Sequence, residues 1–441
     1  CQTDERGVPP FDSRSNFRLI RDRLIEALPQ PPSAVMRMEA ERRDSDMAAR
    51  DYEEMLPLQL DIALLGIGED GHVASVFPGQ HWHWTTNRRV SPGVSPDGLS
   101  RMTLSPMYIA NSELIILVAS GMHKALAVEA ARNALDGSHL YPDGNAGDLK
   151  AALAERFGLR PENFFVGNGA DDVLHNLARA FVNEGEECVI PSPSFHPYTT
   201  VTRVMGGVPV YSPLRDHSID FGDVRSRVTD RTKLVFLCNP NNPTGTLFSR
   251  TEFEAFLGDL PETVVVVLDE AYADFVEGRR SPRSETYIER KGAWIAGVRT
   301  FSKVYGLAGL RVGYGIGRPA LIRALHKTKD PFNVSGPALA AARAALGDKA
   351  FYRRSLKMVH EGKRRIYAGL EKLGIEYVPT EANFVFLRLG PRASRIVRDL
   401  MAGGVIVRPC ASFGLPEHIR VTVGPAGQNE KFLTLLEGAL A

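Results

Sequence analysis

Short runs of β-branched and other apolar residues alternate along the chain with stretches whose apolar residues recur at helical spacing. Several of these runs are apolar throughout, which is typical of strands that are covered on both faces. The pattern predicts an α/β fold with mostly parallel sheets, in which ligands gather at the carboxyl ends of the strands. The predicted strands are residues 62–65, 114–118, 188–190, 208–211, 234–238, 264–268 and 294–298.

The last third of the chain has a different pattern. Helical spacing covers residues 318–329 and 348–373, and apolar strands follow near 384–389 and 419–423. These elements predict a smaller α+β domain after the large sheet. Residues 122–136 predict one amphipathic helix, because no run of Pro, Gly or Ser marks a flexible linker there.

Composition narrows the class of protein. A chain of 441 residues is longer than a single domain usually is, so more than one domain is expected. Lys and Arg number 53 against 52 Asp and Glu, and this net charge of +1 gives no basic surface for nucleic acid. The apolar runs are too short to cross a bilayer, and the four cysteines are far apart. We therefore expect a soluble cytoplasmic protein without disulfides or a metal site, and Cys1 in place of Met suggests a fragment.

Residues 61–79 carry the first candidate site. An apolar strand ends in a glycine-broken turn that holds Glu69, Asp70 and His72, and a helix is predicted to follow. Such a turn frees backbone N–H groups for an anion, and a histidine there is a candidate general base near neutral pH. The glycines match GxGxxG, which is a weak signal alone, so an ordinary tight turn with an exposed His72 explains this stretch equally well.

The neighbouring segments separate these two interpretations. They are DER at 4–6, SNFR at 15–18, LGIGEDGH at 65–72, RMTL at 101–104, Gly121 and Lys124. In order and spacing, residues 1–125 resemble 6-phosphogluconolactonases. The resemblance implies that His72 activates the water that opens a sugar lactone, with Asp4 beside the site. It also implies that Arg6, Arg101 and Lys124 face the phosphate of the substrate.

The resemblance to 6-phosphogluconolactonases is incomplete. In that family a strand and a Gly/Ser-rich phosphate loop precede the DER segment, and a closing helix and a tryptophan-containing tail follow Lys124; this sequence has neither. Because side chains do not replace the backbone donors of a phosphate loop, we expect a remnant with little lactone hydrolysis. Glucosamine-6-phosphate deaminases share the GEDGH turn, but DER and ASVFPG favour the lactonase. The HWHW run at 81–84 predicts a solvent-facing loop and no metal site.

A second set of motifs follows residue 141 in a consistent order. The motifs are YPDG at 141–144, GNGAD at 167–171, PSPSFHPY at 191–198, NPNNPTG at 239–245, DEAYADF at 269–275 and RTFSKVYGLAGLRVGY at 299–314. Taken singly, most of these residues are explained as turns, helix caps or core. Together they supply every contact that pyridoxal phosphate requires: a lysine for a Schiff base, a carboxylate for its ring nitrogen, and donors for its phosphate.

Each contact has a candidate residue. Lys303 is the Schiff-base lysine, and Asp269 keeps the ring nitrogen protonated. Asn242 and Tyr272 donate to the phenolic oxygen of the cofactor, and Phe195 stacks on its ring. The candidates for its phosphate are the helix start at Gly169, Ala170 and Asp171, together with Thr300, Ser302 and Arg311.

Residues 126–441 resemble fold-type I pyridoxal-phosphate aminotransferases, and most closely histidinol-phosphate aminotransferases. PFNVS at 331–335, ANFVF at 382–386, IVRP at 406–409 and IRVTVG at 419–424 add to the match. The resemblance implies a homodimer in which Tyr141 reaches the cofactor phosphate of the neighbouring subunit. It also implies that Arg408, Arg420 and Asn383 hold the substrate, whose anionic group is a phosphate or a carboxylate.

The sequence therefore predicts a partial lactonase-like α/β domain at 1–125, a large cofactor-binding domain at 126–318 and a small domain at 319–441. We expect transamination between histidinol phosphate and 2-oxoglutarate in histidine biosynthesis, with small molecules as the only ligands. The alternatives are a bifunctional protein that also serves the pentose phosphate pathway, and a catalytically impaired fusion of two truncated enzymes. An aromatic aminotransferase and a phosphothreonine decarboxylase also remain open, as does a deletion or assembly error as the origin of the fusion.

Overall fold

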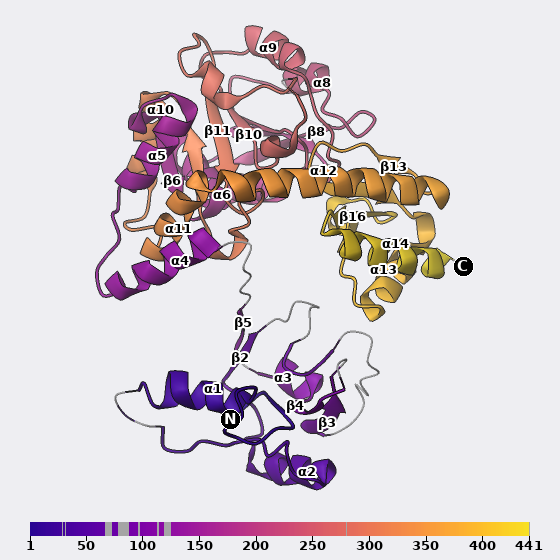
Figure 1. Ribbon diagram of the computed structural model, residues 1–441. Coiled ribbons are helices and arrows are strands. Elements are labelled where there is room, and N and C mark those ends of the chain that lie inside the picture. Colours follow the sequence, from indigo (N-terminus) through magenta and orange to yellow (C-terminus); the bar gives the residue numbers. More distant parts are fainter. Residues whose placement is uncertain are drawn as a thin grey trace. The chain divides into compact units, whose positions relative to one another are not determined.

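The computed structural model divides the chain into two compact units, Cys1–Met122 and His123–Ala441. Figure 1 shows the helices and strands of both. None of the helices in the described part of the chain has the length and apolar character that crossing a membrane requires. The described residues are 1–28, 30, 32–66, 73–77, 88–95, 98–112, 114–118, 125–278 and 280–440.

The first unit contains two small sheets. One is antiparallel, with the strand order β1-β4-β3, and the other is the parallel pair β2-β5. The strands are β1 (Asp4–Arg6), β2 (Ile62–Gly66), β3 (Val90–Val94), β4 (Ser100–Leu104) and β5 (Leu114–Val118). The helices are α1 (Asn16–Ile20), a π-helical turn at Arg21–Ile25, α2 (Ser45–Met55) and α3 (Pro106–Ala110).

Buried Glu5 ties β1 to the start of α1. Its carboxylate accepts hydrogen bonds from the Ser15 hydroxyl at 3.0 Å and from the backbone N–H groups of Asn16 and Phe17 at 2.8 and 2.7 Å. A buried carboxylate is tolerated when donors surround it, so these contacts explain why the DER and SNFR segments lie together. The apolar core of the first unit includes Met38, Tyr52, Leu65, Met102 and Leu104.

The helix predicted after the glycine turn is wrong for residues 73–77. Val73 and Val76 form an isolated antiparallel bridge, and the Val76 N–H donates to the Val73 carbonyl at 3.0 Å. Ala74 has a φ of 53°, in the left-handed region that interrupts a right-handed helix. This short segment is therefore a tight turn, and the glycine turn itself at 67–72 lies outside the described residues.

A seven-stranded sheet organises the second unit, in the order β6-β12-β11-β10-β9-β7-β8. All its neighbouring strands are parallel except β12, which is antiparallel to β11 and β6. The predicted parallel-rich α/β fold is confirmed. The strands are β6 (Phe164–Gly167), β7 (Glu187–Ser192), β8 (Val208–Pro213), β9 (Thr232–Cys238), β10 (Val265–Asp269), β11 (Trp294–Thr300) and β12 (Gly313–Ile316).

Alternate residues of each central strand pack against helices on opposite faces of this sheet. In β9, Leu234 and Phe236 lie in the core under α6, α7 and α10, whereas Val235 and Leu237 lie in the core under α8 and α9. Burial on both faces explains why these strands are apolar throughout. The helices around the sheet are α4 (Ala125–Ala134), α5 (Gly147–Phe157), α6 (Gly169–Phe181), α7 (Pro197–Val204), α8 (Phe221–Ser226), α9 (Arg250–Gly258), α10 (Pro319–Thr328) and α11 (Gly336–Gly347).

A four-stranded antiparallel sheet, β13-β14-β16-β15, forms the end of the second unit. The long helix α12 runs from the large sheet to this small one, which α13 and α14 flank (Figure 1). The predicted α+β ending is confirmed. Its elements are α12 (Lys349–Lys372), β13 (Tyr377–Val378), β14 (Phe384–Arg388), α13 (Ala393–Ala402), β15 (Arg408–Pro409), β16 (His418–Thr422) and α14 (Ala426–Leu440).

Helix α10 belongs with the large sheet. The sequence pattern grouped residues 318–329 with the small domain, but Leu321, Ile322 and Leu325 are buried in the core under α6 and α7. The apolar face of this helix therefore covers the parallel strands. The domain boundary between residues 318 and 319 stays a prediction.

Candidate active site

Asp269 ends strand β10 and is buried, with 2% of its surface exposed. One carboxylate oxygen accepts a hydrogen bond from the Ala271 N–H at 3.0 Å, and the other accepts one from the Tyr198 hydroxyl at 2.6 Å. Burial raises the pKa of Asp269 to about 6, and the hydrogen bond from Tyr198 opposes that rise. A buried carboxylate without a cation is costly, so this position suits a ligand that brings a protonated ring nitrogen.

Lys303 lies in the loop after β11, and its Nζ is 5.2 Å from the centre of the Tyr272 ring. The pKa of Lys303 is lowered, first by burial and then by the neighbouring Arg420 guanidinium, while Asp269 opposes the shift. A lowered pKa increases the neutral fraction of the amine near pH 7. The neutral amine is the form that attacks a carbonyl carbon or accepts a proton.

The start of α6 lies close to the loop after β11 and to strand β12. Gly169 has a φ of 82°, and a Cβ at this position would lie 2.5 Å from the Nη2 of Arg311. A Cβ on Gly313 would lie 2.5 Å from the backbone N of Ala170. Only glycine permits this close approach, which leaves the first N–H groups of a 13-residue helix facing the loop.

Hydroxyl and guanidinium groups flank the same helix start. The Thr300 hydroxyl donates to the Ser302 hydroxyl at 2.9 Å, and the Ser302 N–H donates to the Thr300 hydroxyl at 3.0 Å. Arg311 donates to the Asp171 carboxylate at 3.2 Å, and both side chains are half exposed. These donors suit a dianionic phosphate.

Arg420 reaches the same region from strand β16 of the small sheet. Its Nη1 donates to the side-chain oxygen of Asn242, and its guanidinium lies 4.7 Å from the centre of the Phe384 ring. Its Nε is buried and has no hydrogen-bond partner among the described residues. Burial raises the pKa of the nearby Tyr272 phenol, while Arg420 opposes that rise. An incompletely satisfied guanidinium suits an anionic group of a ligand.

Lys303, Asp269 and the first residues of α6 line one cavity of about 180 Å³. It contains most of the residues that the sequence predicts for the cofactor, and it also contains three that the sequence reasoning missed. The predicted members are Ala170, Asp171, Phe195, Asn242, Asp269, Tyr272, Thr300, Ser302, Lys303 and Arg311, and the additional ones are Cys238, Ala271 and Ala308.

Five predicted residues of the second unit do not line this cavity: Gly169 and Arg420, whose contacts are described above, and Arg408, Asn383 and Tyr141. Arg408 is exposed and contacts Ser412 and the Phe413 ring, although it is the register partner of Arg420. Asn383 uses its backbone carbonyl to accept a hydrogen bond from the N–H of Val423. Tyr141 is 83% exposed and stacks on Phe332 with 4.6 Å between ring centres. Their predicted roles at the substrate and at a second subunit stay predictions.

The sequence also did not reveal Tyr198, a buried residue that does not line the cavity but donates a hydrogen bond to Asp269. Its only signal was its place in PSPSFHPY, three residues after Phe195. Tyr198 lies in the first turn of α7, where the chain turns back from β7 onto the sheet.

In the first unit, strand pairing brings two of the predicted phosphate ligands together. The register of β1 with β4 places Arg6 opposite Arg101, and Asp4 accepts a hydrogen bond from the Ser75 hydroxyl at 2.8 Å. Burial raises the pKa of Asp4. The other two predicted site residues, His72 and Lys124, lie outside the described residues.

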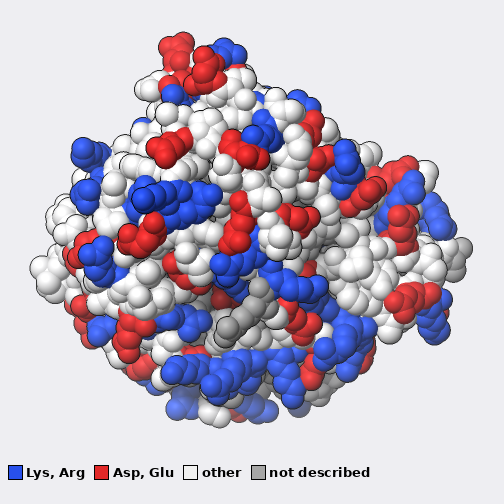
Figure 2. Space-filling model, turned by 90° about the horizontal axis from the view of Figure 1, so that it is seen from above, with Lys and Arg blue, Asp and Glu red and all other residues white. Residues whose placement is uncertain are grey.

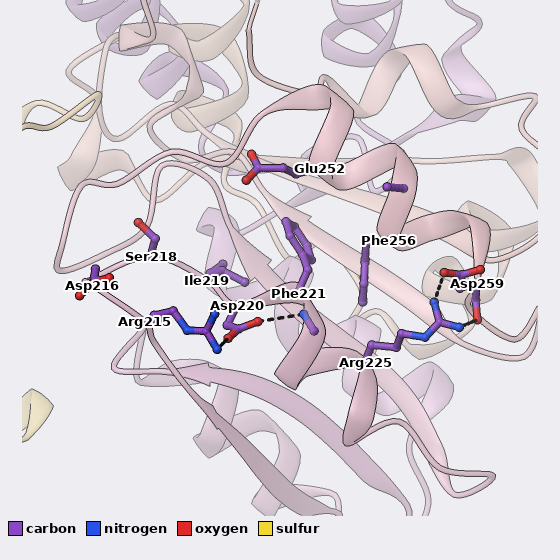
Figure 3. A pocket seen from close by; sticks show the side chains of 12 residues that line it. Arg215, Asp216, Ser218, Ile219, Asp220, Phe221, Arg225, Glu252, Phe256 and Asp259 are labelled. Carbon is purple, nitrogen blue, oxygen red and sulfur yellow. Dashed lines mark hydrogen bonds and ion pairs between the residues drawn. The ribbon is translucent and has the colours of Figure 1, made fainter.

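A larger open pocket of about 690 Å³ lies between α8, α9 and the loop before α8 (Figure 3). Both of its arginines pair with aspartates of the pocket. Arg215 lies 2.8 Å from Asp220, and Arg225 contacts Asp259. No residue of the predicted site lines this pocket. Because both arginines are already paired, we do not assign this pocket an anionic ligand.

Comparisons with known proteins agree with this geometry. Residues 118–438 match the family Aminotransferase class I and II, and residues 1–152 match the family Glucosamine-6-phosphate isomerases/6-phosphogluconolactonase. Histidinol-phosphate aminotransferase of Moorella thermoacetica is 45% identical over 315 residues, which are 71% of this chain and 82% of that protein. Both predicted resemblances are thereby confirmed.

Two solved structures extend the similarity to the fold. Histidinol-phosphate aminotransferase from Sinorhizobium meliloti, in complex with pyridoxal-5'-phosphate, is 31% identical with a TM-score of 0.67 and covers 71% of this chain and 86% of its own. L-threonine-O-3-phosphate decarboxylase from Porphyromonas gingivalis is 27% identical with a TM-score of 0.64 and covers 72% of this chain and 95% of its own. The predicted fold type is confirmed.

Proposed function

Because the chain belongs to the class I and II aminotransferases, a pyridoxal-phosphate-dependent family, we propose that it exchanges the amino group of histidinol phosphate with 2-oxoglutarate. The observation that carries the proposal is the cavity of about 180 Å³ in which Lys303, Asp269 and the start of α6 meet. When bound, pyridoxal phosphate supplies a reactive aldehyde and a ring that accepts the electron pair of the bond that breaks. The 45% identity to a histidinol-phosphate aminotransferase supports this substrate.

Lys303 performs two tasks in this proposal. Its Nζ would hold the cofactor, and the free amine would accept and return the proton of the substrate carbon that carries the amino group. Burial and Arg420 favour the neutral amine that both tasks need. Asp269 and Phe195 line the same cavity. The Asp269 carboxylate would pair with the ring nitrogen of the cofactor, and Phe195 would pack against its ring.

The remaining side chains orient the anionic groups. Ser302, Thr300 and Arg311 hold the cofactor phosphate together with the first N–H groups of α6. Arg420 binds the anionic group of the substrate, because its Nε is buried and lacks a partner among the described residues. Histidinol phosphate offers a phosphate and glutamate a carboxylate, and both fit a guanidinium fork.

We further propose a homodimer in which Tyr141 acts across the interface. Tyr141 is 83% exposed, and its contact with Phe332 leaves its hydroxyl outside the cavity of its own subunit. An exposed tyrosine of this kind is available to the cofactor phosphate of a second copy. The residues that complete each site would then come from two chains.

An assay with competing substrates tests the proposed reaction. The full chain is loaded with pyridoxal phosphate and supplied with 2-oxoglutarate and either histidinol phosphate or an aromatic amino acid, and glutamate is measured. Carbon dioxide release from phosphothreonine is measured in parallel, since a decarboxylase is among the structural neighbours. We expect kcat/KM for histidinol phosphate to exceed the others by about tenfold or more. A faster reaction with either competitor would replace the proposed substrate.

Lactone hydrolysis is a second candidate activity. The first unit carries a domain of the glucosamine-6-phosphate isomerase/6-phosphogluconolactonase family, and Arg6, Arg101 and Asp4 lie on paired strands there. Hydrolysis of 6-phosphogluconolactone by the full chain is compared with that of His72→Ala. A rate that His72→Ala lowers would establish the second activity, and equal rates would exclude His72 catalysis.

A further inference from the structure

Tyr198 contacts both side chains that the proposed function assigns to the cofactor ring. We propose that Tyr198 is a positioning residue, which holds the Asp269 carboxylate and the Phe195 ring in the arrangement that binds the cofactor. The inference rests on the proposed function, because it concerns the cofactor at that same site.

Two aromatic rings and one hydrogen bond fix the side chain of Tyr198. It is fully buried, and its ring stacks on Phe236 with 4.7 Å between centres and 12° between planes. Its ring also meets Phe195 edge to face, at 5.6 Å and 82°. These contacts fix the direction of the hydroxyl, which donates to Asp269 Oδ2 at 2.6 Å.

The hydrogen bond favours the ionised carboxylate. Asp269 is 2% exposed, and the only other hydrogen bond to its carboxylate in the described residues comes from the Ala271 N–H. Burial raises the pKa of Asp269, and the Tyr198 hydroxyl opposes the rise more than any other group does. Without that hydroxyl the carboxylate would take up a proton at higher pH. A neutral Asp269 would no longer pair with a protonated ring nitrogen.

Tyr198→Phe separates this role from packing. Phenylalanine keeps the ring contacts with Phe236 and Phe195 and removes only the hydroxyl. Tyr287→Phe is the matched control, because Tyr287 is also a buried tyrosine whose hydroxyl donates to a carboxylate, that of Glu254 at 3.2 Å. Tyr287 lies in the core under α9 and does not line the cavity.

The experiment measures the dissociation constant of pyridoxal phosphate for the full chain from about pH 5 to about pH 8, by quenching of protein fluorescence. We expect Tyr198→Phe to raise this constant about tenfold or more at neutral pH, as for a lost hydrogen bond to a charged group. We also expect the acidic limb of its pH profile to move to higher pH. A purely structural role would raise the constant equally at every pH, as a general loss of stability does.

Three outcomes distinguish the claims. Wild-type affinity and an unshifted profile in Tyr198→Phe would overturn this inference while leaving the proposed function intact. Wild-type protein that binds no cofactor would overturn both.

The double variant of Asp269→Asn and Tyr198→Phe provides a second readout. If the Tyr198 hydroxyl acts through the Asp269 carboxylate, Tyr198→Phe should cause no further loss of cofactor affinity once Asp269→Asn is present. Circular dichroism and urea unfolding of each cofactor-free variant check the fold, and an additive loss in the double variant would contradict the inference.

Discussion

At the scale of single residues, Asp269 makes the stability of the cofactor-free protein depend on pH. Burial raises its pKa from 3.8 to about 6, so the folded state binds a proton more tightly than the unfolded chain does. Its contribution to stability is therefore fully present below about pH 4 and is lost as the pH rises through about 6. The shift corresponds to a loss of about 3 kcal/mol.

Asp269→Asn removes this titration and supplies the comparison. We expect the wild-type free energy of unfolding to fall relative to that of Asp269→Asn between about pH 4 and about pH 7, in urea and without cofactor. With cofactor bound the trend should weaken or reverse, because the ring nitrogen then stabilises the ionised carboxylate. Parallel profiles for the two proteins without cofactor would mean that Asp269 does not titrate there.

The residues of the cavity could be predicted because their signals are local. Asp269 ends a strand, and Lys303 and Asn242 lie in short motifs a few residues after one; parallel strands bring their carboxyl ends to one edge. Tyr198 and Cys238 could not be predicted, since a buried tyrosine and a buried cysteine resemble core residues until the contacts of the fold are known. The register that sets Cys238 beside Asp269 depends on strand pairing across 31 positions of sequence.

At the scale of elements, the close packing of β12 against the start of α6 sets the phosphate end of the cavity. Gly313→Ala would place a Cβ 2.5 Å from the backbone N of Ala170, and backbone there has little room to move. We expect a loss of about 1–3 kcal/mol in stability and weaker cofactor binding. Gly336→Ala, at the start of α11 where a Cβ meets nothing within 4 Å, should change neither quantity. Equal effects of the two variants, in urea unfolding and cofactor titration, would refute this account.

A buried ion cluster joins the ends of β10 and β11. Arg299 donates to both oxygens of Glu270, at 3.0 and 3.1 Å, and to Glu285 at 2.6 Å. Glu270→Gln would remove a negative charge that compensates the buried Arg299 guanidinium. We therefore expect the free energy of unfolding, measured in urea, to fall by about 3–5 kcal/mol. Glu361→Gln breaks the exposed pair with Lys357 and should leave stability unchanged. A change in stability as small as that of Glu361→Gln would show that water solvates the Arg299 guanidinium when the Glu270 carboxylate is removed.

Element types could be predicted better than element neighbours. The span of α12 and the strands of the small sheet follow from spacing that is visible in the sequence. The sequence pattern grouped α10 with the small domain because its apolar face fits either sheet, and only the contacts of Leu321 and Leu325 show that it packs in the large core. The turn at 73–77 depends on a left-handed Ala74, and alanine gives no signal of that conformation.

At the scale of the whole molecule, the chain combines two family domains, and the family matches overlap over residues 118–152. Acidic and basic side chains mix over much of the face in Figure 2, and Lys and Arg gather along its lower edge.

Mixing two inactive variants tests the proposed dimer. Lys303→Ala lacks the lysine of its own site, and Tyr141→Ala lacks the tyrosine that we assign to the partner's site. A mixed dimer would carry one intact site and one doubly defective site. We expect an equal mixture, after subunit exchange, to recover about a quarter of wild-type transaminase activity. No recovery, with mixed dimers confirmed by native mass spectrometry, would place Tyr141 in the site of its own chain.

Covalent capture of pyridoxal phosphate by Lys303 tests most directly whether this cavity is the cofactor site. The full chain is loaded with pyridoxal phosphate, its visible absorbance is recorded, and borohydride reduction is followed by peptide mass spectrometry. We predict visible absorbance and a label on Lys303 in the wild type and in Lys357→Ala, whose lysine is exposed on α12. Lys303→Ala should show neither. A colourless wild type, or a label that persists elsewhere in Lys303→Ala, would contradict the account.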